Sequence, residues 1–199
     1  MKGSIEVIAG GMFSGKTEEL LRRVRREVYA GKFVQLFKHA LDDRYAVEHV
    51  VTHDQTALPC IPVQSSNDIL THMREETRVV GVDEANFFDE GLVDVVQALA
   101  DRGLKVLLAG LDMDFRRVPF GPMPSLLAIA DDVTKIRAVC ITCGEMANYS
   151  YRCDGSDDVV HVGSTDAYEA RCRSCYHMGT RICAVPPERR PSLTTSTSS

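Results

Sequence analysis

Residues 10–17 constrain this chain more than any other segment, because they read G-G-M-F-S-G-K-T. An apolar run at 5–9 precedes them, and a helical pattern from Glu18 to Tyr29 follows. In this strand–loop–helix context, G-x-x-x-x-G-K-[ST] predicts a loop whose backbone N–H groups surround phosphate oxygens. The predicted phosphate-binding residues are Gly10, Gly11, Met12, Phe13, Ser14, Gly15, Lys16 and Thr17.

Two side chains at the end of this loop carry specific chemistry. Lys16 supplies a positive charge for the outer phosphates, and the Thr17 hydroxyl is placed to reach a magnesium ion. The positive end of the following helix adds to the attraction for phosphate. The motif therefore predicts binding of a nucleoside triphosphate such as ATP with Mg2+.

Composition limits the remaining function classes. The 199 residues carry a net charge of −5, which gives no overall basic surface for nucleic acid. The basic run at 22–26 is interpreted as the solvated face of the first helix, because Leu20, Leu21, Val24 and Val28 form an apolar stripe beside it. No segment is apolar enough to cross a membrane, and the first residues lead directly into a strand without a signal peptide. We expect a cytoplasmic protein with no membrane or nucleic-acid partner.

The order of elements predicts an α/β fold with a mostly parallel sheet, over residues 1–136. We expect strands near 5–9, 33–37, 79–83, 104–109 and 133–138, and helices near 16–30, 66–75, 90–102 and 124–130. Segment 39–62 lacks clear periodicity and is long for a connector, which favours a functional or mobile loop. From residue 137 paired cysteines replace the helical pattern, so we expect a small second domain over 137–185 and a disordered tail over 186–199.

A second polar pair follows the apolar run at 77–82. Asp83 and Glu84 come where that strand ends, and ligands of open α/β sheets bind beyond the carboxyl ends of strands. Asp83 is therefore predicted to help hold magnesium, and Glu84 to accept a proton from the attacking group. No N-K-x-D guanine motif is present, so a small kinase or a small ATPase is favoured over a GTPase.

Two C-x-x-C pairs stand in the second part of the chain. Twenty-eight residues separate the pair Cys140 and Cys143 from the pair Cys172 and Cys175. Four thiolates suit a tetrahedral, structural zinc ion. The alternatives are free thiols or redox couples, or a ligand set that includes Cys153, Cys183 or His177, while Cys60 is expected to be a buried apolar residue.

Several stretches together resemble the type II thymidine kinases, the cytosolic family that contains zinc. The similarity spans about residues 3–180 in a consistent order. The stretches that carry it are 10–17, Phe37-Lys38 with Asp42-Asp43-Arg44-Tyr45, 83–88, 110–116, 119–124, and both cysteine pairs with Tyr168 just before the second.

The resemblance implies a fold and an activity. It implies a RecA-like P-loop domain with a zinc-binding lasso domain, and transfer of the ATP γ-phosphoryl group to the 5′-hydroxyl of thymidine. Deoxyuridine is an expected second substrate, and the product dTMP serves nucleotide salvage for DNA synthesis. The family is usually a homotetramer inhibited by dTTP, so we expect the same here.

The resemblance also implies roles for individual residues. Glu84 matches the general base, and Asp42 and Arg44 match residues near the transferred phosphoryl group. The apolar pocket around the thymine ring is matched by Met12, Phe87, Leu111, Phe115 and Phe120. Tyr168 matches a contact on the sugar side. A loop that closes over the base is matched by Ser150 and by Val159, Val160, His161, Val162 and Gly163.

Two residues depart from the family pattern. Asn86, expected near the phosphates, stands where Gln is common, and Ser150 stands where Thr is common. Both leave the preferred nucleoside open. The rival functions are a zinc-ribbon nucleic-acid-binding P-loop ATPase and a kinase for another small hydroxyl substrate.

Overall fold

A computed structural model describes residues 2–40, 49–51, 57–153 and 167–179. Within them, six parallel strands form one sheet in the order β5-β2-β6-β7-β1-β8. The strands are β1 (Ser4–Ala9), β2 (Phe33–His39), β5 (Ile61–Val63), β6 (Thr77–Asp83), β7 (Lys105–Gly110) and β8 (Asp132–Lys135). The α/β fold with a parallel sheet is confirmed.

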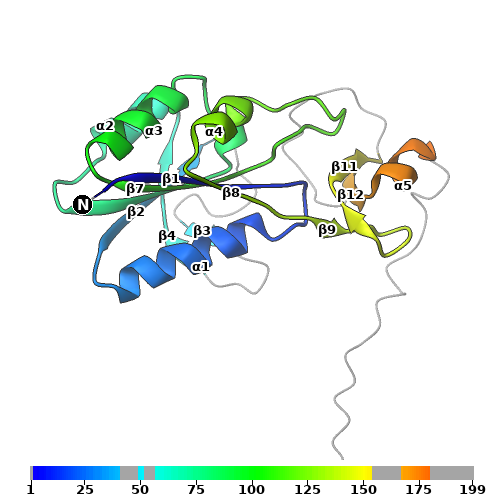
Figure 1. Ribbon diagram of the computed structural model, residues 1–199, viewed down its shortest axis with the longest axis horizontal. Helices are drawn as coiled ribbons and strands as arrows, with labels where there is room; N and C mark the ends of the chain where they lie inside the picture. Colours follow the sequence, from blue (N-terminus) through cyan, green and yellow to red (C-terminus); the bar gives the residue numbers. More distant parts are fainter. Residues whose placement is uncertain (1, 41–48, 52–56, 154–166, 180–199) are drawn as a thin grey trace, which may run out of the picture.

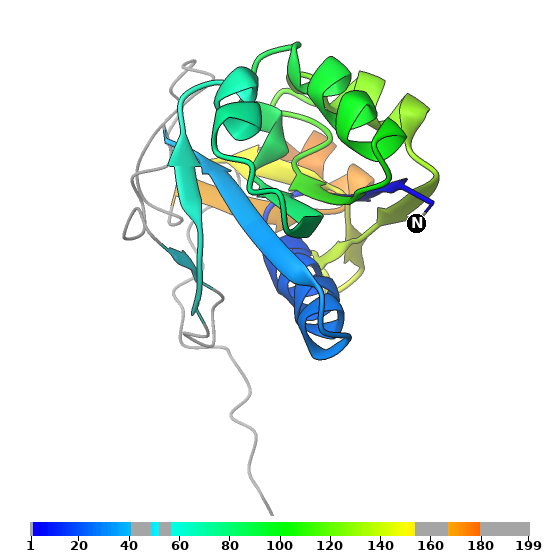
Figure 2. The same ribbon diagram turned by 90° about the vertical axis from the view of Figure 1, so that its left-hand side faces the viewer.

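Helices cover both faces of this sheet (Figures 1 and 2). Helix α1 (Lys16–Tyr29) packs on one face. The other face carries α2 (Ser66–Thr71), α3 (Leu92–Asp101) and α4 (Met123–Ile129). A short 3-10 turn, η1 (Ala85–Phe87), follows β6. Among the described residues, no helix combines the length and apolar character that a membrane span requires.

Alternation along the strands builds two hydrophobic cores. In β1, Val7 faces the layer of α2, α3 and α4, while Ile8 faces α1, and both are fully buried. Leu20 and Leu21 of α1 are also fully buried against the second core. Each such leucine contributes about 2 kcal/mol relative to an exposed position. The apolar stripe predicted for the first helix thus fixes α1 on the sheet, although Val28 is exposed.

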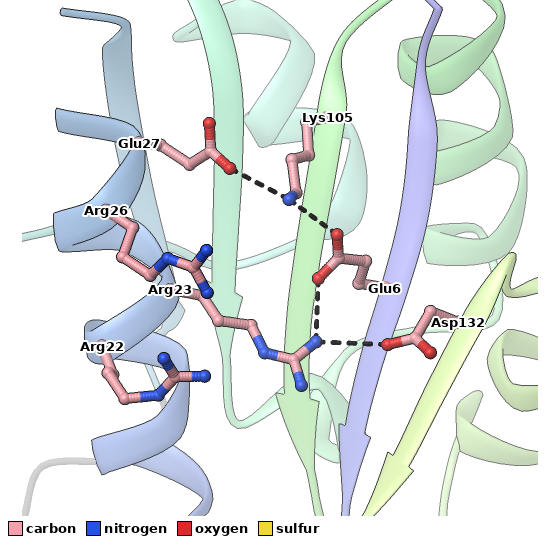
Figure 3. Close-up of a pocket in the computed structure, with 7 residues that line it drawn as sticks. All are labelled: Glu6, Arg22, Arg23, Arg26, Glu27, Lys105 and Asp132. Carbon is pink, nitrogen blue, oxygen red and sulfur yellow. Dashed lines mark hydrogen bonds and ion pairs between the residues drawn. The ribbon is translucent and has the colours of Figure 1, made fainter. Parts of the chain in front are cut away.

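A charged pocket lies between α1 and the sheet (Figure 3). Arg23 is partly buried there and forms ion pairs with Glu6 of β1 at 2.8 Å and Asp132 of β8 at 3.4 Å. Lys105 of β7 joins Glu6 and Glu27 at 2.6 and 2.9 Å. Arg22 and Arg26 are exposed as expected, but Arg23 belongs to this network and not to a fully solvated face. The pocket lies beside the first residues of β1, β7 and β8, away from their carboxyl ends.

Most predicted elements of the sheet domain are confirmed within a few residues, with two differences. The helix expected at 66–75 ends earlier, at Thr71. Beyond this end, the backbone N–H of Arg74 donates to the Gln35 side chain at 2.9 Å and not to a helix carbonyl. Segment 39–62 contains the antiparallel pair β3 (His49–Val51) and β4 (Ala57–Pro59) and the start of β5. Strands of three residues are too short to give a periodic pattern.

The described residues after β8 include two small antiparallel strand pairs beside the carboxyl edge of the sheet (Figure 1). Strand β9 (Ala138–Val139) pairs with β10 (Met146–Ala147), and β11 (Tyr149–Arg152) pairs with β12 (Tyr168–Arg171). A five-residue helix, α5 (Arg173–His177), follows β12. We refer to 137–153 with 167–179 as the cysteine-bearing lobe.

Candidate active site

The phosphate-binding loop connects β1 to α1 and has a conformation that its sequence requires. Gly10 has φ 157°, and a Cβ there would collide with the Ile136 carbonyl oxygen. Phe13 adopts φ 63°, an uncommon left-handed conformation for a non-glycine residue. The Ser14 hydroxyl and the Lys16 ammonium both donate to the Gly11 carbonyl oxygen at 2.8 Å. These bonds hold the lysine over the loop.

Burial and nearby carboxylates act in opposite directions on the pKa of Lys16. Burial lowers the pKa of Lys16, while Glu84, Asp83 and Asp112 act in the opposite direction. These carboxylates come from the ends of β6 and β7, so the parallel sheet brings all three toward one lysine. A phosphate group approaching here would meet a concentrated positive charge with nearby acidic groups available for a metal ion.

Thr17 and Asp83 meet at the same edge. The Thr17 hydroxyl lies 3.3 Å from each carboxylate oxygen of Asp83. Asp83 is buried, and burial together with the adjacent Glu84 raises its pKa to about 7, against the lowering effects of Lys38 and Lys16. A hydroxyl and a carboxylate are the oxygen ligands that Mg2+ prefers. The residues present therefore fit a magnesium ion bound between them.

Glu84 occupies a strained turn directly after Asp83. Its φ of 53° and ψ of 42° are left-handed, which costs about 1–2 kcal/mol for a residue with a Cβ. The Glu84 carbonyl accepts the Phe87 N–H at 3.0 Å, which closes η1. Glu84 is half-buried, whereas Asp83 is buried. Strain of this kind is frequent where a reacting group is positioned.

Asn86 links this turn to the loop after β7. Its side-chain oxygen accepts the Leu111 N–H at 2.8 Å, and the residue is 2% exposed. Its Nδ2 atom is buried with no hydrogen-bond partner among the described residues. Gly121 has φ 49°, and a Cβ there would collide with the Asn86 carbonyl oxygen. The predicted phosphate contact of Asn86 stays a prediction, whereas its bond to Leu111 is explicit.

The aromatic residues predicted for a base pocket lie on three neighbouring segments. Phe87 and Phe120 form an edge-to-face pair with ring centroids 5.6 Å apart. The Arg152 guanidinium lies 5.1 Å from the Phe115 ring centroid and 5.6 Å from that of Tyr168. All four aromatic side chains are half-buried. Partly exposed rings leave faces on which a flat apolar ligand can stack.

The cysteine-bearing lobe touches the phosphate-binding loop directly. The Met12 N–H donates to the Ser150 hydroxyl oxygen at 3.0 Å, across 138 residues of sequence. A Cβ on Gly11 would lie 3.1 Å from the Asn148 carbonyl oxygen, so the two backbones approach closely. Ser150, expected beside the base, therefore also contacts the loop that precedes α1.

Some predicted site residues cannot be placed. They lie outside the described residues and are Asp42, Arg44, Val159, Val160, His161, Val162 and Gly163. Cys183, the alternative zinc ligand, also lies outside them.

The structure adds one acidic residue to those singled out by sequence. Asp112 is buried, influences Lys16 and forms a 2.6 Å ion pair with Lys135 at the end of β8. The available signal was its position two residues beyond Gly110, the last residue of a buried strand. Acidic residues at the carboxyl end of a parallel sheet are candidates for a functional site.

The four predicted cysteine ligands converge. The sulfur atoms of Cys140, Cys143, Cys172 and Cys175 all lie within 4.8 Å of one another, with Cys143 and Cys172 at 3.7 Å. Tetrahedral zinc with Zn–S bonds of about 2.3 Å requires sulfur separations of about 3.8 Å. Although burial opposes it, backbone N–H groups from Cys172, Cys143 and Thr142 lower the pKa of Cys140 to about 6. The set fits a structural zinc ion.

The other zinc candidates in the described chain lie apart from this cluster. Cys153 is not one of the four converging residues, and His177 contacts Arg117 and Tyr176. Cys60 is buried at 7% exposure within the α1 core, as expected for an apolar role.

Comparison with known proteins gives consistent matches. The family model described as thymidine kinase matches residues 3–176. A thymidine kinase of Porphyromonas gingivalis is 54% identical over 187 residues, which cover 94% of this chain and 89% of the relative. A thymidine kinase of Bacteroides thetaiotaomicron is 52% identical over 175 residues, 88% of this chain and 87% of the relative. Domain III of the Thermotoga maritima replication initiation protein DnaA is similar at TM-score 0.41 and 15% identity, over 68% of this chain and 56% of that chain.

Proposed function

The chain belongs to the thymidine kinase family and is an ATP-dependent nucleoside kinase, and we propose that it makes dTMP by phosphorylating the 5′-hydroxyl of thymidine. The observation that carries the proposal is the edge where Lys16, the Thr17–Asp83 pair and Glu84 meet. Lys16 suits phosphate, the Thr17–Asp83 pair suits magnesium, and the half-buried Glu84 is proposed to receive the proton of the second substrate.

On the donor side, the loop amides and Lys16 hold the β- and γ-phosphates of ATP. Thr17 and Asp83 would hold Mg2+, which supplies charge neutralisation when bound. Asp42 and Arg44 are proposed to lie near the γ-phosphoryl group, and Asn86 near the phosphates. Alignment and neutralisation of charge account for most of the catalysis expected in phosphoryl transfer.

On the acceptor side, Glu84 takes the proton of the 5′-hydroxyl. The bond from that oxygen to the γ-phosphorus forms as the bond from the γ-phosphorus to the β–γ bridging oxygen breaks, and ADP leaves. Glu84 follows Asp83 directly and adopts a left-handed backbone conformation at the end of β6. Glu84 is half-buried, so part of its side chain is exposed at this edge, and a positioned carboxylate can act as a general base.

We propose that the thymine ring stacks among half-buried apolar side chains. These are Met12, Phe87, Leu111, Phe115 and Phe120, with Tyr168 toward the sugar. Ser150 and residues 159–163 are proposed to close over the base. Deoxyuridine is proposed as a second substrate from the family resemblance.

The remaining features are proposed from the family resemblance. Residues 1–136 form the kinase domain and 137–185 the zinc-binding lasso domain, followed by a tail over 186–199. The four cysteines hold structural zinc, as their separations favour. The enzyme is proposed to be a cytoplasmic homotetramer that dTTP inhibits and that serves nucleotide salvage.

A direct assay tests this proposal. Purified protein is incubated with γ-labelled ATP, Mg2+ and each nucleoside in turn, and labelled monophosphate is measured. We expect the highest kcat/KM for thymidine, followed by deoxyuridine. Labelled monophosphate from a different nucleoside only would overturn the thymidine assignment, and ATP hydrolysis stimulated by nucleic acid without nucleoside would favour the ATPase alternative.

A further inference from the structure

Tyr176 connects the cysteine cluster to the loop that carries Phe115. It lies in α5, directly after Cys175. Its hydroxyl donates a 2.6 Å hydrogen bond to the Phe115 carbonyl oxygen, across 61 residues of sequence. No role was predicted for Tyr176 from the sequence, because nothing in its neighbourhood indicates a partner in the sheet domain.

The loop that receives this bond is a braced turn over residues 113–119. The Asp114 carboxylate accepts the N–H groups of Arg116 and Val118 at 2.8 and 2.9 Å. Met113 and Pro119 form an antiparallel bridge. Arg117 has φ 67°, a left-handed conformation that costs about 1–2 kcal/mol. A turn held by its own Asp114 keeps its shape, but its orientation depends on contacts with neighbouring segments.

Further contacts between α5 and this turn involve Arg117. Its guanidinium carbon lies 4.7 Å from the Tyr176 ring centroid, within cation–π range. Its Nη1 atom lies 3.0 Å from Nε2 of His177. The Tyr176 ring also packs against Tyr149 and Tyr151 of β11, with centroids 5.4 and 5.5 Å away. The Tyr176 side chain therefore packs within the lobe and contacts two residues of the turn, Phe115 and Arg117.

Phe115 is held from two directions as a result. Tyr176 fixes its backbone carbonyl, and Arg152 of β11 lies 5.1 Å from its ring centroid. Arg152 also lies over Tyr168, the predicted sugar-side residue, at 5.6 Å. Both contacts come from the cysteine-bearing lobe, so the position of this ring depends on where the lobe is anchored.

We propose that Tyr176 is a positioning residue for the nucleoside site, acting through the 113–119 turn on Phe115. The cysteine cluster fixes α5, α5 presents the Tyr176 hydroxyl, and the hydroxyl holds the turn at the distance that lets Phe115 stack on the base. This inference rests on the proposed function, which places Phe115 at the thymine ring. The cysteine-bearing lobe would then orient the 113–119 turn of the sheet domain in addition to holding zinc.

The test removes one oxygen atom with Tyr176→Phe and uses Tyr151→Phe as the matched control. Tyr151 belongs to the same aromatic cluster, and its hydroxyl forms no hydrogen bond with the described residues. Because Tyr176→Phe loses one hydrogen bond, we expect the KM of thymidine to rise about three- to tenfold. The KM of ATP and the zinc content stay at the wild-type values, and Tyr151→Phe behaves as wild type.

A second readout does not depend on activity. Hydrogen exchange of the 113–118 backbone amides is measured in the zinc-loaded wild type and both variants. We expect exchange at least about twofold faster in Tyr176→Phe than in the wild type, since the turn loses its external hydrogen bond. Exchange in β6, at the centre of the sheet, stays unchanged and serves as the internal reference.

The outcomes separate this inference from the proposed function. Unchanged exchange of 113–118 in Tyr176→Phe overturns the inference even if thymidine is the substrate. Faster exchange with an unaltered KM of thymidine overturns the link to the nucleoside site. Loss of zinc in Tyr176→Phe overturns it too, because the residue would then support the cluster and not the turn. A wild-type protein that phosphorylates no thymidine overturns the proposed function, whatever the exchange result.

Discussion

The backbone N–H of Met12 donates a 3.0 Å hydrogen bond to the side-chain oxygen of Ser150. This bond joins the phosphate-binding loop to β11 in the cysteine-bearing lobe, and Ser150 is buried where it forms. A loop amide that is held in place does not need to be ordered when a ligand binds. The lobe therefore helps to hold the phosphate-binding loop, in addition to its proposed role in positioning Phe115.

Removal of this contact should weaken catalysis modestly. We expect Ser150→Ala to lower kcat/KM for ATP about two- to tenfold, because Met12 loses its only described acceptor. Ser150→Thr keeps a hydroxyl and should retain most of the activity. The measurement is steady-state kinetics with ATP varied at saturating thymidine. Equal values for the two variants would mean that the hydrogen bond has no functional weight.

Asp83 should make folding stability depend on pH. Burial, aided by Glu84, raises its pKa from the usual 3.8 to about 7, although Lys38 and Lys16 oppose the shift. The folded state then binds this proton more tightly than the unfolded chain, so stability falls as pH rises from about 4 to about 7. Without added magnesium, Asp83→Asn should raise the unfolding free energy at pH 8 by about 1–3 kcal/mol.

Urea unfolding at pH 4 and pH 8 measures this effect, together with the loss of phosphoryl transfer in Asp83→Asn. At pH 4 the two proteins should have similar stability, since Asp83 is then protonated in the folded wild type. Asp94→Asn is the matched control, because Asp94 is exposed on α3. A stability difference that is the same at both pH values would show that Asp83 does not titrate as described.

Glu84 is predicted to act in turnover and not in binding. Glu84→Gln keeps the size of the side chain but cannot accept the 5′-hydroxyl proton. We expect kcat to fall by about 10²- to 10⁴-fold while the dissociation constants of ATP and thymidine change less than about threefold. Rapid-quench kinetics and calorimetry provide these values. Near-normal turnover in Glu84→Gln, with exposed Glu90→Gln as a reference, would remove Glu84 from the base role.

The sequence signals for the predicted donor side are local. Residues 10–17 form one loop, and Asp83 with Glu84 directly follows a buried strand. The contacts of Asp112 and Tyr176 were not predicted, since their partners Lys135 and Phe115 lie far away along the chain. The order of the strands in the sheet decides which loops lie side by side. Hydrophobic periodicity predicts where strands and helices are, but it does not predict the order of the strands.

The family resemblance predicts that Asn86 lies near the phosphates. The structure shows that its side-chain oxygen accepts the Leu111 N–H, a contact that the sequence did not predict. We expect Asn86→Ala to reduce the unfolding free energy by about 1–3 kcal/mol, because the partly buried Leu111 N–H loses its acceptor. Its effect on KM should be larger for thymidine than for ATP, since Leu111 belongs to the proposed base pocket. Gln97→Ala, exposed on α3, is the control. A larger rise in the KM of ATP would favour the phosphate role instead.

The cysteine cluster should be required for zinc and for the order of its lobe. Cys172 lies at the start of α5, and its sulfur accepts the Cys175 N–H at 3.5 Å in addition to lying 3.7 Å from the Cys143 sulfur. Cys172→Ser should therefore reduce zinc from about one ion per chain to nearly none by elemental analysis. Because binding of a structural metal is coupled to folding, hydrogen exchange in β11 and β12 should rise at the same time. Cys153→Ser, which changes a thiol outside the cluster, should keep its zinc, and full zinc content in Cys172→Ser would show that the ligand set is wrong.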